Sequence, residues 1–433
     1  MKKIVIIGAG VAGLGIGWKL AEAGAEVAIL ERAQAGGAAT LASGGMIAAA
    51  AELGHASGPD VDFARRSGAM WPGFAAALQE RTGIEIGYRR NGSLLVMLEG
   101  EVPHAKPELG ETCPHAHGGS MHGHAQAHGK TEPDEANPHA HGASKLSPAE
   151  ARAMEPMLAE CAKGALWAPD EAVVDTHAMA RALIAAFKKA GGTLSTNEAA
   201  VNIETEDGRV TGARTPFALY RADAYILAAG AWNAHVNLTK LVSGHRGSHI
   251  EELPRETLPP VIPVKGEIIV LEPPSGAALP KHTVWGNSIY VVPRGHRLLV
   301  GATAELAGYD TSPTPEATAW LRRQSAGLMP ALQSWRMVEH WVGLRPASAD
   351  GMPILGQSAV GGLFIAGGQY RNGILFAPAI AETMSRLVLE RATVDSAFDP
   401  RRFSGAKADK PGFIIETAHR QAGPGIQEWQ VGF

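Results

Sequence analysis

The N-terminal segment places a glycine-rich string between two apolar runs, and this arrangement constrains the fold more than any other feature of the chain. Residues 4–7 form a short β-branched run that is typical of a buried parallel strand. The string Gly-Ala-Gly-Val-Ala-Gly follows at 8–13, and residues 14–23 then have a helical apolar pattern. Residues 26–30 read as a second strand. The chain therefore opens with a complete βαβ unit.

Each glycine of this string has a separate use in binding a dinucleotide. Gly8 permits the tight turn, Gly10 lets backbone approach a pyrophosphate, and Gly13 lets the helix pack on the strand. The helix N-terminus then presents free N–H groups and a positive dipole end to phosphate. Glu31 closes the second strand, where a carboxylate accepts hydrogen bonds from a ribose. A glycine-rich turn without a ligand is disfavoured by this agreement, whereas NAD and FAD both still fit.

Composition narrows the class of protein further. A chain of 433 residues is too long for one compact core and indicates at least two domains. The net charge of -4 gives no electrostatic basis for binding nucleic acid or an anionic membrane. Two cysteines without a CxxC spacing exclude a zinc ribbon and a thioredoxin-like pair, and they favour a cytoplasmic location. No apolar stretch is long enough for a membrane span. The apolar run after Lys2 and Lys3 resembles the start of a signal peptide, but the glycines that interrupt it argue against that interpretation.

The rest of the chain alternates predicted helices and strands around one low-complexity segment. Ser147 begins a helix as its cap, and residues 72–81, 176–189 and 373–389 are also expected to be helical. The predicted strands are 93–97, 200–203, 224–227, 268–271, 288–292, 298–300 and 363–366, and the turns among the later ones indicate an antiparallel sheet. The His-rich segment near residues 100–147 has no apolar period and is expected to be a mobile loop.

Several motifs beyond Glu31 resemble the D-amino-acid-oxidase-like family of flavoproteins, and within it the glycine oxidases of thiamine biosynthesis. The resemblance runs from residue 1 to about 400, the His-rich loop excepted. It decides for FAD over NAD. The motifs that carry it are GAATLASGGM at 37–46, ILAAGAW at 226–232, PVKGE at 263–267, YVVPR at 290–294, VGAT at 300–303, GLRP at 343–346, DGMP at 350–353 and YRNGIL at 370–375.

The resemblance implies an α/β fold with two domains. A discontinuous Rossmann-type FAD-binding domain is expected over 1–80, 148–240 and 335–400. A substrate domain with a mainly antiparallel sheet is expected over 81–99 and 241–334. The remaining segments are the His-rich mobile insertion at 100–147 and a C-terminal tail at 401–433.

The resemblance also implies which residues contact FAD, many of them through backbone groups. Besides the glycines and Glu31 of the opening unit, the expected contacts are Val11, Ala12, Arg32, Ala39, Thr40, Ser43, Gly44, Gly45, Met46, Val201, Ala229, Gly230, Trp232, Gln369, Tyr370, Arg371, Asn372, Gly373, Ile374 and Leu375.

Three residues are expected at the substrate. An Arg binds a carboxylate with both oxygens at once, and Arg345 matches the family's carboxylate-binding Arg. Tyr290 matches the active-site Tyr, and Arg371 lies in the turn next to the flavin, where we favour a role in orienting that turn. The alternatives are an Arg345 that braces the domain interface and a Tyr290 that only fills the core. No general base is expected, because the flavin carries the hard step.

The implied reaction is the FAD-dependent oxidative deamination of glycine or a small amine-substituted amino acid such as sarcosine or D-alanine. Its products are the oxo acid, ammonia or an amine, and H2O2, and O2 is the electron acceptor. The reaction is expected to supply the thiamine thiazole pathway. We also expect a homo-oligomer. One alternative is a dehydrogenase that passes electrons to a quinone or a partner protein. Another is a metal-binding protein with a vestigial flavin fold.

Two features depart from the glycine oxidase pattern. Ala304 stands where that pattern has a bulkier residue, which predicts a larger pocket. The inserted loop is foreign to the family and gathers histidines on a segment that fixes no geometry. We therefore favour incidental divalent metal binding over a physiological metal-binding role, and we assign no metal ligand at the redox site. The histidines are His104, His115, His117, His122, His124, His128, His139 and His141, with Cys113 among them.

Overall fold

The computed structural model describes residues 1–53, 58–98, 143–244 and 247–403. Most of the predicted His-rich insertion and of the predicted tail lies outside these residues. The helices are α1 (Val11–Glu22), α2 (Ala49–Leu53), α3 (Pro59–Thr82), α4 (Pro148–Met154), α5 (Thr176–Lys189), α6 (Pro315–Leu328) and α7 (Ala377–Glu390).

A six-stranded sheet forms the centre of the first domain, in the order β20-β21-β12-β1-β2-β8. All neighbours in it are parallel except β20 and β21. Both faces of the sheet are covered, which explains the unbroken apolar run in the first strand. Ile4 and Ile6 face one hydrophobic cluster, and Val5 and Ile7 face another. The strands are β1 (Lys3–Ile7), β2 (Glu26–Leu30), β8 (Thr193–Ser195), β12 (Ala224–Leu227), β20 (Ile354–Gln357) and β21 (Leu363–Gly367).

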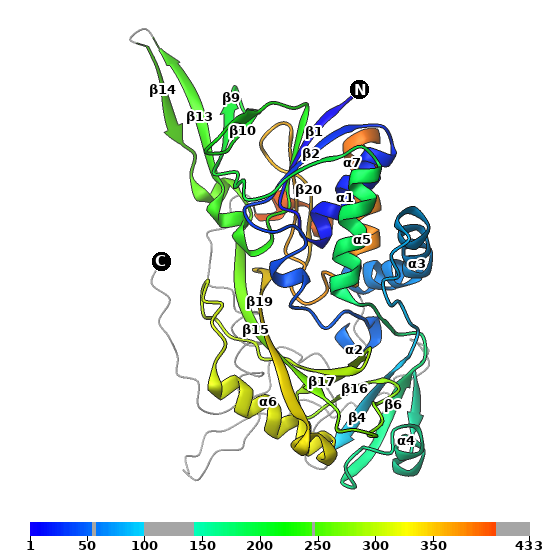
Figure 1. Cartoon of the computed structure of the whole chain (residues 1–433). Coiled ribbons are helices and arrows are strands. Elements are labelled where there is room, and N and C mark those ends of the chain that lie inside the picture. The colour runs from blue at the N-terminus through cyan, green and yellow to red at the C-terminus, as the bar shows by residue number, and fades with distance from the viewer. Residues whose placement is uncertain (54–57, 99–142, 245–246, 404–433) are drawn as a thin grey trace, which may run out of the picture.

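Helices cover one face of this sheet and a smaller sheet covers the other. The α1 helix lies between α5 and α7, with α3 packed outside them (Figure 1). The second, five-stranded sheet has the order β11-β10-β9-β13-β14, and its last two strands form a hairpin that projects from the domain (Figure 1). These strands are β9 (Asn202–Glu206), β10 (Arg209–Arg214), β11 (Leu219–Tyr220), β13 (Asn237–Gly244) and β14 (Gly247–Glu252).

An eight-stranded sheet forms the second domain, in the order β19-β15-β18-β17-β16-β4-β6-β5. One face packs on α6 through residues such as Ile269 and Val291. The opposite face carries Ile268, Val292 and Tyr290 and points back toward the first domain. The strands are β4 (Ser93–Leu98), β5 (Ser144–Leu146), β6 (Ala162–Ala168), β15 (Val261–Glu272), β16 (Thr283–Gly286), β17 (Ile289–Arg294), β18 (Arg297–Gly301) and β19 (Arg336–Ser348). A separate two-stranded antiparallel sheet pairs β3 (Met46–Ile47) with β7 (Ala172–Val173).

The sequence predicted most of these elements. The opening strands and helix, the helix over 176–189 and the strand over 224–227 are confirmed, and Ser147 caps α4 in a full capping box with Glu150. The α3 helix is longer than predicted, because it begins at Pro59 and continues through Pro72. The predicted α/β fold with a mainly antiparallel substrate domain is confirmed.

The domain boundaries stay a prediction, but several strands pair outside the segment assigned to them. The β5 strand falls in the predicted mobile insertion at 100–147 and pairs with β6 in the eight-stranded sheet. The β6 and β19 strands fall in segments predicted for the cofactor domain and pair in the eight-stranded sheet. The β14 strand falls in a segment predicted for the substrate domain and pairs with β13 instead. Strand pairing joins residues far apart in the chain, so a linear division of the sequence does not capture it. Among the described helices, none combines the length and the apolar character that crossing a membrane requires.

The close contact between α1 and the loop after β1 gives a first prediction. A Cβ added at Gly13 would lie 1.9 Å from the carbonyl oxygen of Gly8. We expect Gly13→Ala to lower the free energy of unfolding by about 1–3 kcal/mol, the usual cost of overpacking, measured by urea denaturation. Gly73→Ala is the control, because Gly73 lies exposed in α3 with no atom within 4 Å of an added Cβ. It should be neutral or stabilising by up to about 1 kcal/mol. Equal stability of the two variants would contradict the packing argument.

Candidate active site

A cavity of about 840 Å³ lies where the two domains meet. One wall consists of the carboxyl ends of β1 and β2, the start of α1 and the segment Gly37–Met46. The other wall comes from β15, β17 and β19 of the eight-stranded sheet, and from the segment that follows β21. The carboxyl edge of a parallel sheet is where α/β proteins bind their ligands, so the position of the cavity follows from the topology.

The start of α1 offers the cavity an anion site. The helix begins after Gly10, which makes no side-chain capping bond, and its first turn contains no acidic residue. The N–H of Val11 donates to the Thr40 hydroxyl at 3.1 Å, which ties the helix end to the segment 38–42. The backbone of Gly8 has φ +107, which only glycine adopts without strain. A helix end of this kind binds phosphate through its N–H groups and its dipole.

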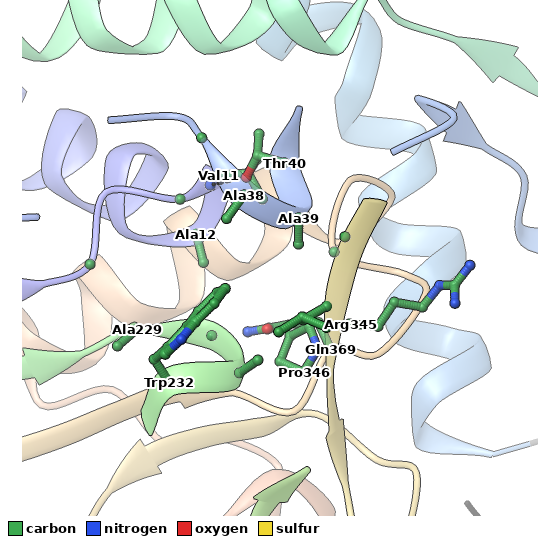
Figure 2. Close-up of a pocket in the computed structure, with 18 of the residues that line it drawn as sticks. Val11, Ala12, Ala38, Ala39, Thr40, Ala229, Trp232, Arg345, Pro346 and Gln369 are labelled. Atoms are coloured by element: carbon green, nitrogen blue, oxygen red, sulfur yellow. Dashed lines mark hydrogen bonds between the residues drawn. The ribbon is translucent and has the colours of Figure 1, made fainter. Parts of the chain in front are cut away.

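The end of the cavity beside β2 is shaped by Glu31 and by a cation–π pair. The Glu31 carboxylate accepts the N–H of Ala9 at 2.8 Å and that of Ala33 at 2.9 Å, and so it is fixed at the end of β2. The guanidinium of Arg32 lies 3.7 Å from the ring centre of Trp232. Figure 2 shows Trp232 at one end of the labelled residues and Arg345 at the other, with Gln369 and Pro346 between them.

Two polar groups in the wall lack a protein partner and point to a polar ligand. The side-chain Nε2 of Gln369 and the hydroxyl of Tyr370 are buried, and neither has a hydrogen-bond partner within the described residues. Both residues line the cavity. Since buried polar groups are nearly always paired, these atoms fit a cofactor that carries its own donors and acceptors. The chemistry of the wall therefore suits FAD, whose phosphates, ribose and ring would meet these parts in turn.

At the opposite end, Arg345 lies on the face of β19 that points into the cavity. Its Nη1 donates to the carbonyl of Thr303 at 2.9 Å, which leaves the rest of the guanidinium for a ligand. The guanidinium crosses the neighbouring strand at Gly266, where an added Cβ would lie 2.3 Å from Nη1. Gly266 therefore provides the space that Arg345 occupies.

The hydroxyl of Tyr290 faces the same end of the cavity. Burial raises the pKa of Tyr290 to about 12, although the charges of Arg345, Arg294 and Arg371 oppose this. The phenol consequently stays protonated at neutral pH and can donate a hydrogen bond. Its ring also packs against Trp285 at 5.3 Å between ring centres, and this contact limits its rotation.

Arg371 is paired inside the cavity wall. Its Nε lies 3.2 Å from Oε2 of Glu52, and its Nη2 donates to the Glu52 carbonyl at 3.2 Å. Burial opposes the charge of Arg371, but Glu52 and the nearby tyrosines outweigh it and raise the pKa of the guanidinium above its ordinary value. Because Glu52 already neutralises it, Arg371 is a weaker candidate than Arg345 for holding a carboxylate.

The structure brings nearly all residues predicted for the site into this one cavity. Three do not line it. Gly13 packs against Gly8, and the Leu375 carbonyl accepts from Ser67 and Trp71 of α3. The Asn372 N–H donates to the Gln369 carbonyl, and its own carbonyl accepts from Phe376. The predicted residues in the lining are Gly8, Gly10, Val11, Ala12, Glu31, Arg32, Ala39, Thr40, Ser43, Gly44, Gly45, Met46, Val201, Ala229, Gly230, Trp232, Tyr290, Arg345, Gln369, Tyr370, Arg371, Gly373 and Ile374.

Ala304 does not bear on the size of the cavity. It is fully buried and packs with Val264 and Ala347 instead of lining the cavity. The expected enlargement at this position therefore has no support in the structure.

Sequence reasoning missed Glu52 and Gly266 as lining residues. Glu52 did carry a signal, since it is the one Asp, Glu, Lys or Arg between Arg32 and Asp60. An isolated carboxylate in a Gly- and Ala-rich stretch needs a partner, and here the partner is Arg371. Within the described ranges no group of three or more His, Cys, Asp or Glu side chains could hold a metal ion. The His-rich loop is outside those ranges.

The fold and the cavity together define an oxidoreductase that binds a dinucleotide cofactor between two domains. The profile of the DAO family, FAD dependent oxidoreductases, matches residues 3–387. The glycine oxidase of Geobacillus kaustophilus is 32% identical over 93% of this chain and 96% of its own length. Its crystal structure matches with a TM-score of 0.75 at 29% identity, over 93% of this chain and 99% of that one.

The chain belongs to the DAO family of FAD dependent oxidoreductases, and its cofactor is FAD. The predicted family is thereby confirmed. The bifunctional protein ThiO/ThiG of Nostoc sp. is also similar, with 33% identity over 90% of this chain. This chain covers only 53% of that protein, so it spans about half the length of such bifunctional relatives.

Glu171 supports the cavity wall from behind. Its carboxylate accepts the N–H of Ala51 at 2.9 Å, at the start of the helix that carries Glu52. Burial raises the pKa of Glu171 to about 7, although hydrogen bonds from Ser93 and from the Ala50 and Ala51 backbone oppose the shift.

This raised pKa predicts how stability depends on pH. Between pH 4.5 and 7 the folded state keeps a proton on Glu171 that the unfolded state has released, so stability falls as the pH rises through this window. The contribution amounts to about 3 kcal/mol at most. Glu171→Gln keeps an acceptor but cannot titrate, and it should lose less stability between pH 5 and pH 8 than wild type does. Urea denaturation at both pH values measures this, with exposed Glu80→Gln as the control. A variant with the wild-type pH dependence would contradict it.

Proposed function

We propose that this protein is a glycine oxidase, which oxidises glycine or a small N-substituted glycine with O2. The observation that carries the proposal is the position of Arg345 at the end of the FAD cavity, with Tyr290 beside it. The relatives named glycine oxidase support the choice of substrate. The relatives named ThiO/ThiG support a use of the product in the thiazole branch of thiamine biosynthesis.

In the proposed reaction, Arg345 binds the substrate carboxylate through the part of its guanidinium that Thr303 does not use. The protonated hydroxyl of Tyr290 donates a second hydrogen bond to the substrate. FAD, when bound, supplies the acceptor for the two electrons of the α C–H bond. The protein thus contributes orientation at close range, and no side chain is assigned as a general base.

The overall balance is glycine, O2 and water giving glyoxylate, ammonia and H2O2. A dehydrogenase that passes electrons to a quinone or a partner protein is the alternative with the same site. Three further statements stay predictions. They are a homo-oligomeric state, a cytoplasmic location, and an amino acid and O2 as the small-molecule partners. Incidental metal binding by the His-rich loop also stays one.

Anaerobic mixing with glycine, sarcosine, N-ethylglycine and D-alanine tests the proposal. At least glycine or sarcosine should bleach the flavin absorbance, because Arg345 offers a small carboxylate the part of its guanidinium that Thr303 does not use. Admission of air should then restore the colour within the turnover time and release one H2O2 per flavin reoxidised. Bleaching followed by slow reoxidation would favour the dehydrogenase, and no bleaching by any of the four would refute the proposed substrate class.

Arg345→Ala tests the carboxylate assignment separately. The variant should keep its FAD, since Arg345 makes none of the contacts at the phosphate end. Its KM for glycine should rise about 100-fold or more, because hydrogen bonds to a charged group contribute roughly 1.5–3 kcal/mol each. Arg345→Lys keeps the positive charge but lacks the planar guanidinium, so its KM for glycine should lie between the values of wild type and Arg345→Ala. Arg214→Ala is the control. Arg214 lies on β10 and pairs with Glu204 of β9 at the surface, so this variant should have wild-type kinetics. Wild-type KM in Arg345→Ala would rule the assignment out.

A further inference from the structure

Arg294, at the end of β17, reaches the segment that forms the middle of the cavity wall. Its Nη2 donates to the Gly44 carbonyl at 2.7 Å and lies 3.4 Å from the carbonyls of Ser43 and Val174. Its Nη1 donates to the Thr176 hydroxyl at 3.2 Å. One guanidinium thus holds two segments of the cofactor domain, residues 43–44 and 174–176, although it belongs to the sheet of the other domain.

The charge of Arg294 has no carboxylate partner. Within the described residues no Asp or Glu forms an ion pair with it, and its hydrogen bonds go to carbonyls and a hydroxyl. Asp175 is the carboxylate that acts on it electrostatically, but Oδ1 of Asp175 already accepts two N–H groups at the start of α5. Burial lowers the pKa of Arg294 to about 10, so the group is still a cation at neutral pH. An unpaired cation is costly to enclose, which points to a role beyond holding the fold.

The geometry of the peptide group gives Arg294 an effect on the cavity. Gly44 and Gly45 line the cavity, whereas Arg294 lies outside it. In a trans peptide the C=O and the following N–H point in opposite directions. Because the Ser43 and Gly44 carbonyls turn toward Arg294, the N–H groups of Gly44 and Gly45 point away from it. Neither N–H has an acceptor among the described residues.

The close fit at Gly45 supports this arrangement. A Cβ at Gly45 would lie 2.6 Å from Nη2 of Arg294 and 2.1 Å from the Val174 carbonyl oxygen. The φ of Gly45 is +74, in the left-handed region. The turn therefore combines a left-handed backbone conformation at Gly45 with a close approach of the Arg294 guanidinium to the backbone of that residue.

We propose that Arg294 is a positioning residue for the flavin, which turns the Gly44 and Gly45 N–H groups into the cavity as a pair of donors and places a positive charge behind them. The donors and the charge stabilise the negative charge that the flavin gains on reduction more than they stabilise the oxidised ring. This proposal rests on FAD as the cofactor and is independent of which amino acid is oxidised.

The test is the flavin midpoint potential of the holoenzyme, measured against a reference dye during photochemical reduction without any amino acid. Arg294→Met should weaken the preference for reduced over oxidised flavin at least tenfold, which lowers a two-electron potential by about 30 mV. Sulfite, which adds to the flavin ring and leaves negative charge on it, should bind at least tenfold more weakly. Arg294→Lys keeps the charge but cannot donate to Thr176 and Gly44 at once, so it should recover only part of both losses. Arg297→Met removes a guanidinium from the same hairpin, where Glu339 pairs with it, and should leave both values as in wild type.

Wild-type potential and sulfite affinity in either Arg294 variant would overturn the proposal. An equal loss in Arg297→Met would overturn it too, because the effect would then follow the net charge of the hairpin. If Arg294→Met does not fold, the comparison of Arg294→Lys with Arg297→Met decides by the same criteria. Failure of the proposed glycine oxidation would leave these values unaffected, so the two proposals can fail separately.

Discussion

The long antiparallel pairing of β15 with β19 is the interaction on which the site depends. It runs in register from Val261 opposite Ser348 to Glu272 opposite Arg336, with one irregularity near the far end. Both strands contact the η3 turn (Gly230–His235) of the cofactor domain, and in the substrate sheet β19 is the edge strand with β15 beside it. Hydrogen bonds between these antiparallel strands hold the residues of β19 in register with their partners on β15. Arg345, which it carries, is consequently fixed relative to both the cofactor and the substrate side of the cavity.

Local sequence signals predicted the parts of the fold that local physics determines. The glycine string, the β-branched run before it and the Ser147 capping box each specify their own structure within a few residues, and all three are present. The long hairpin of β13 and β14 gave no such signal, because its strands mix polar and apolar residues and pair mainly with each other. The same limit applies to β6 and β19, because the sheet that each joins is set by partner strands elsewhere in the chain, β4 and β5 in one case and β15 in the other, and not by their own composition.

The site shows the same division. Arg345, Tyr290 and the pyrophosphate-binding glycines belong to short motifs, so the resemblance to a family could locate them. Glu52 and Arg294 act through pairs with residues far away in the chain, Arg371 in one case and Gly44 in the other. Such pairs depend on the tertiary fold, which a motif does not describe. The glycines at 45 and 266 are similar, because what they contribute is the space for a guanidinium from another strand.

The order of strands in the six-stranded sheet has a consequence for synthesis on the ribosome. The β1 strand needs β12 beside it, and β12 in turn needs β21, which begins only at Leu363. Until that part of the chain has emerged, one edge of β12 stays without its neighbour. An unpaired apolar strand edge can associate with other chains. Between the synthesis of β12 and that of β21, the nascent chain therefore exposes an apolar strand edge that is open to association with other chains.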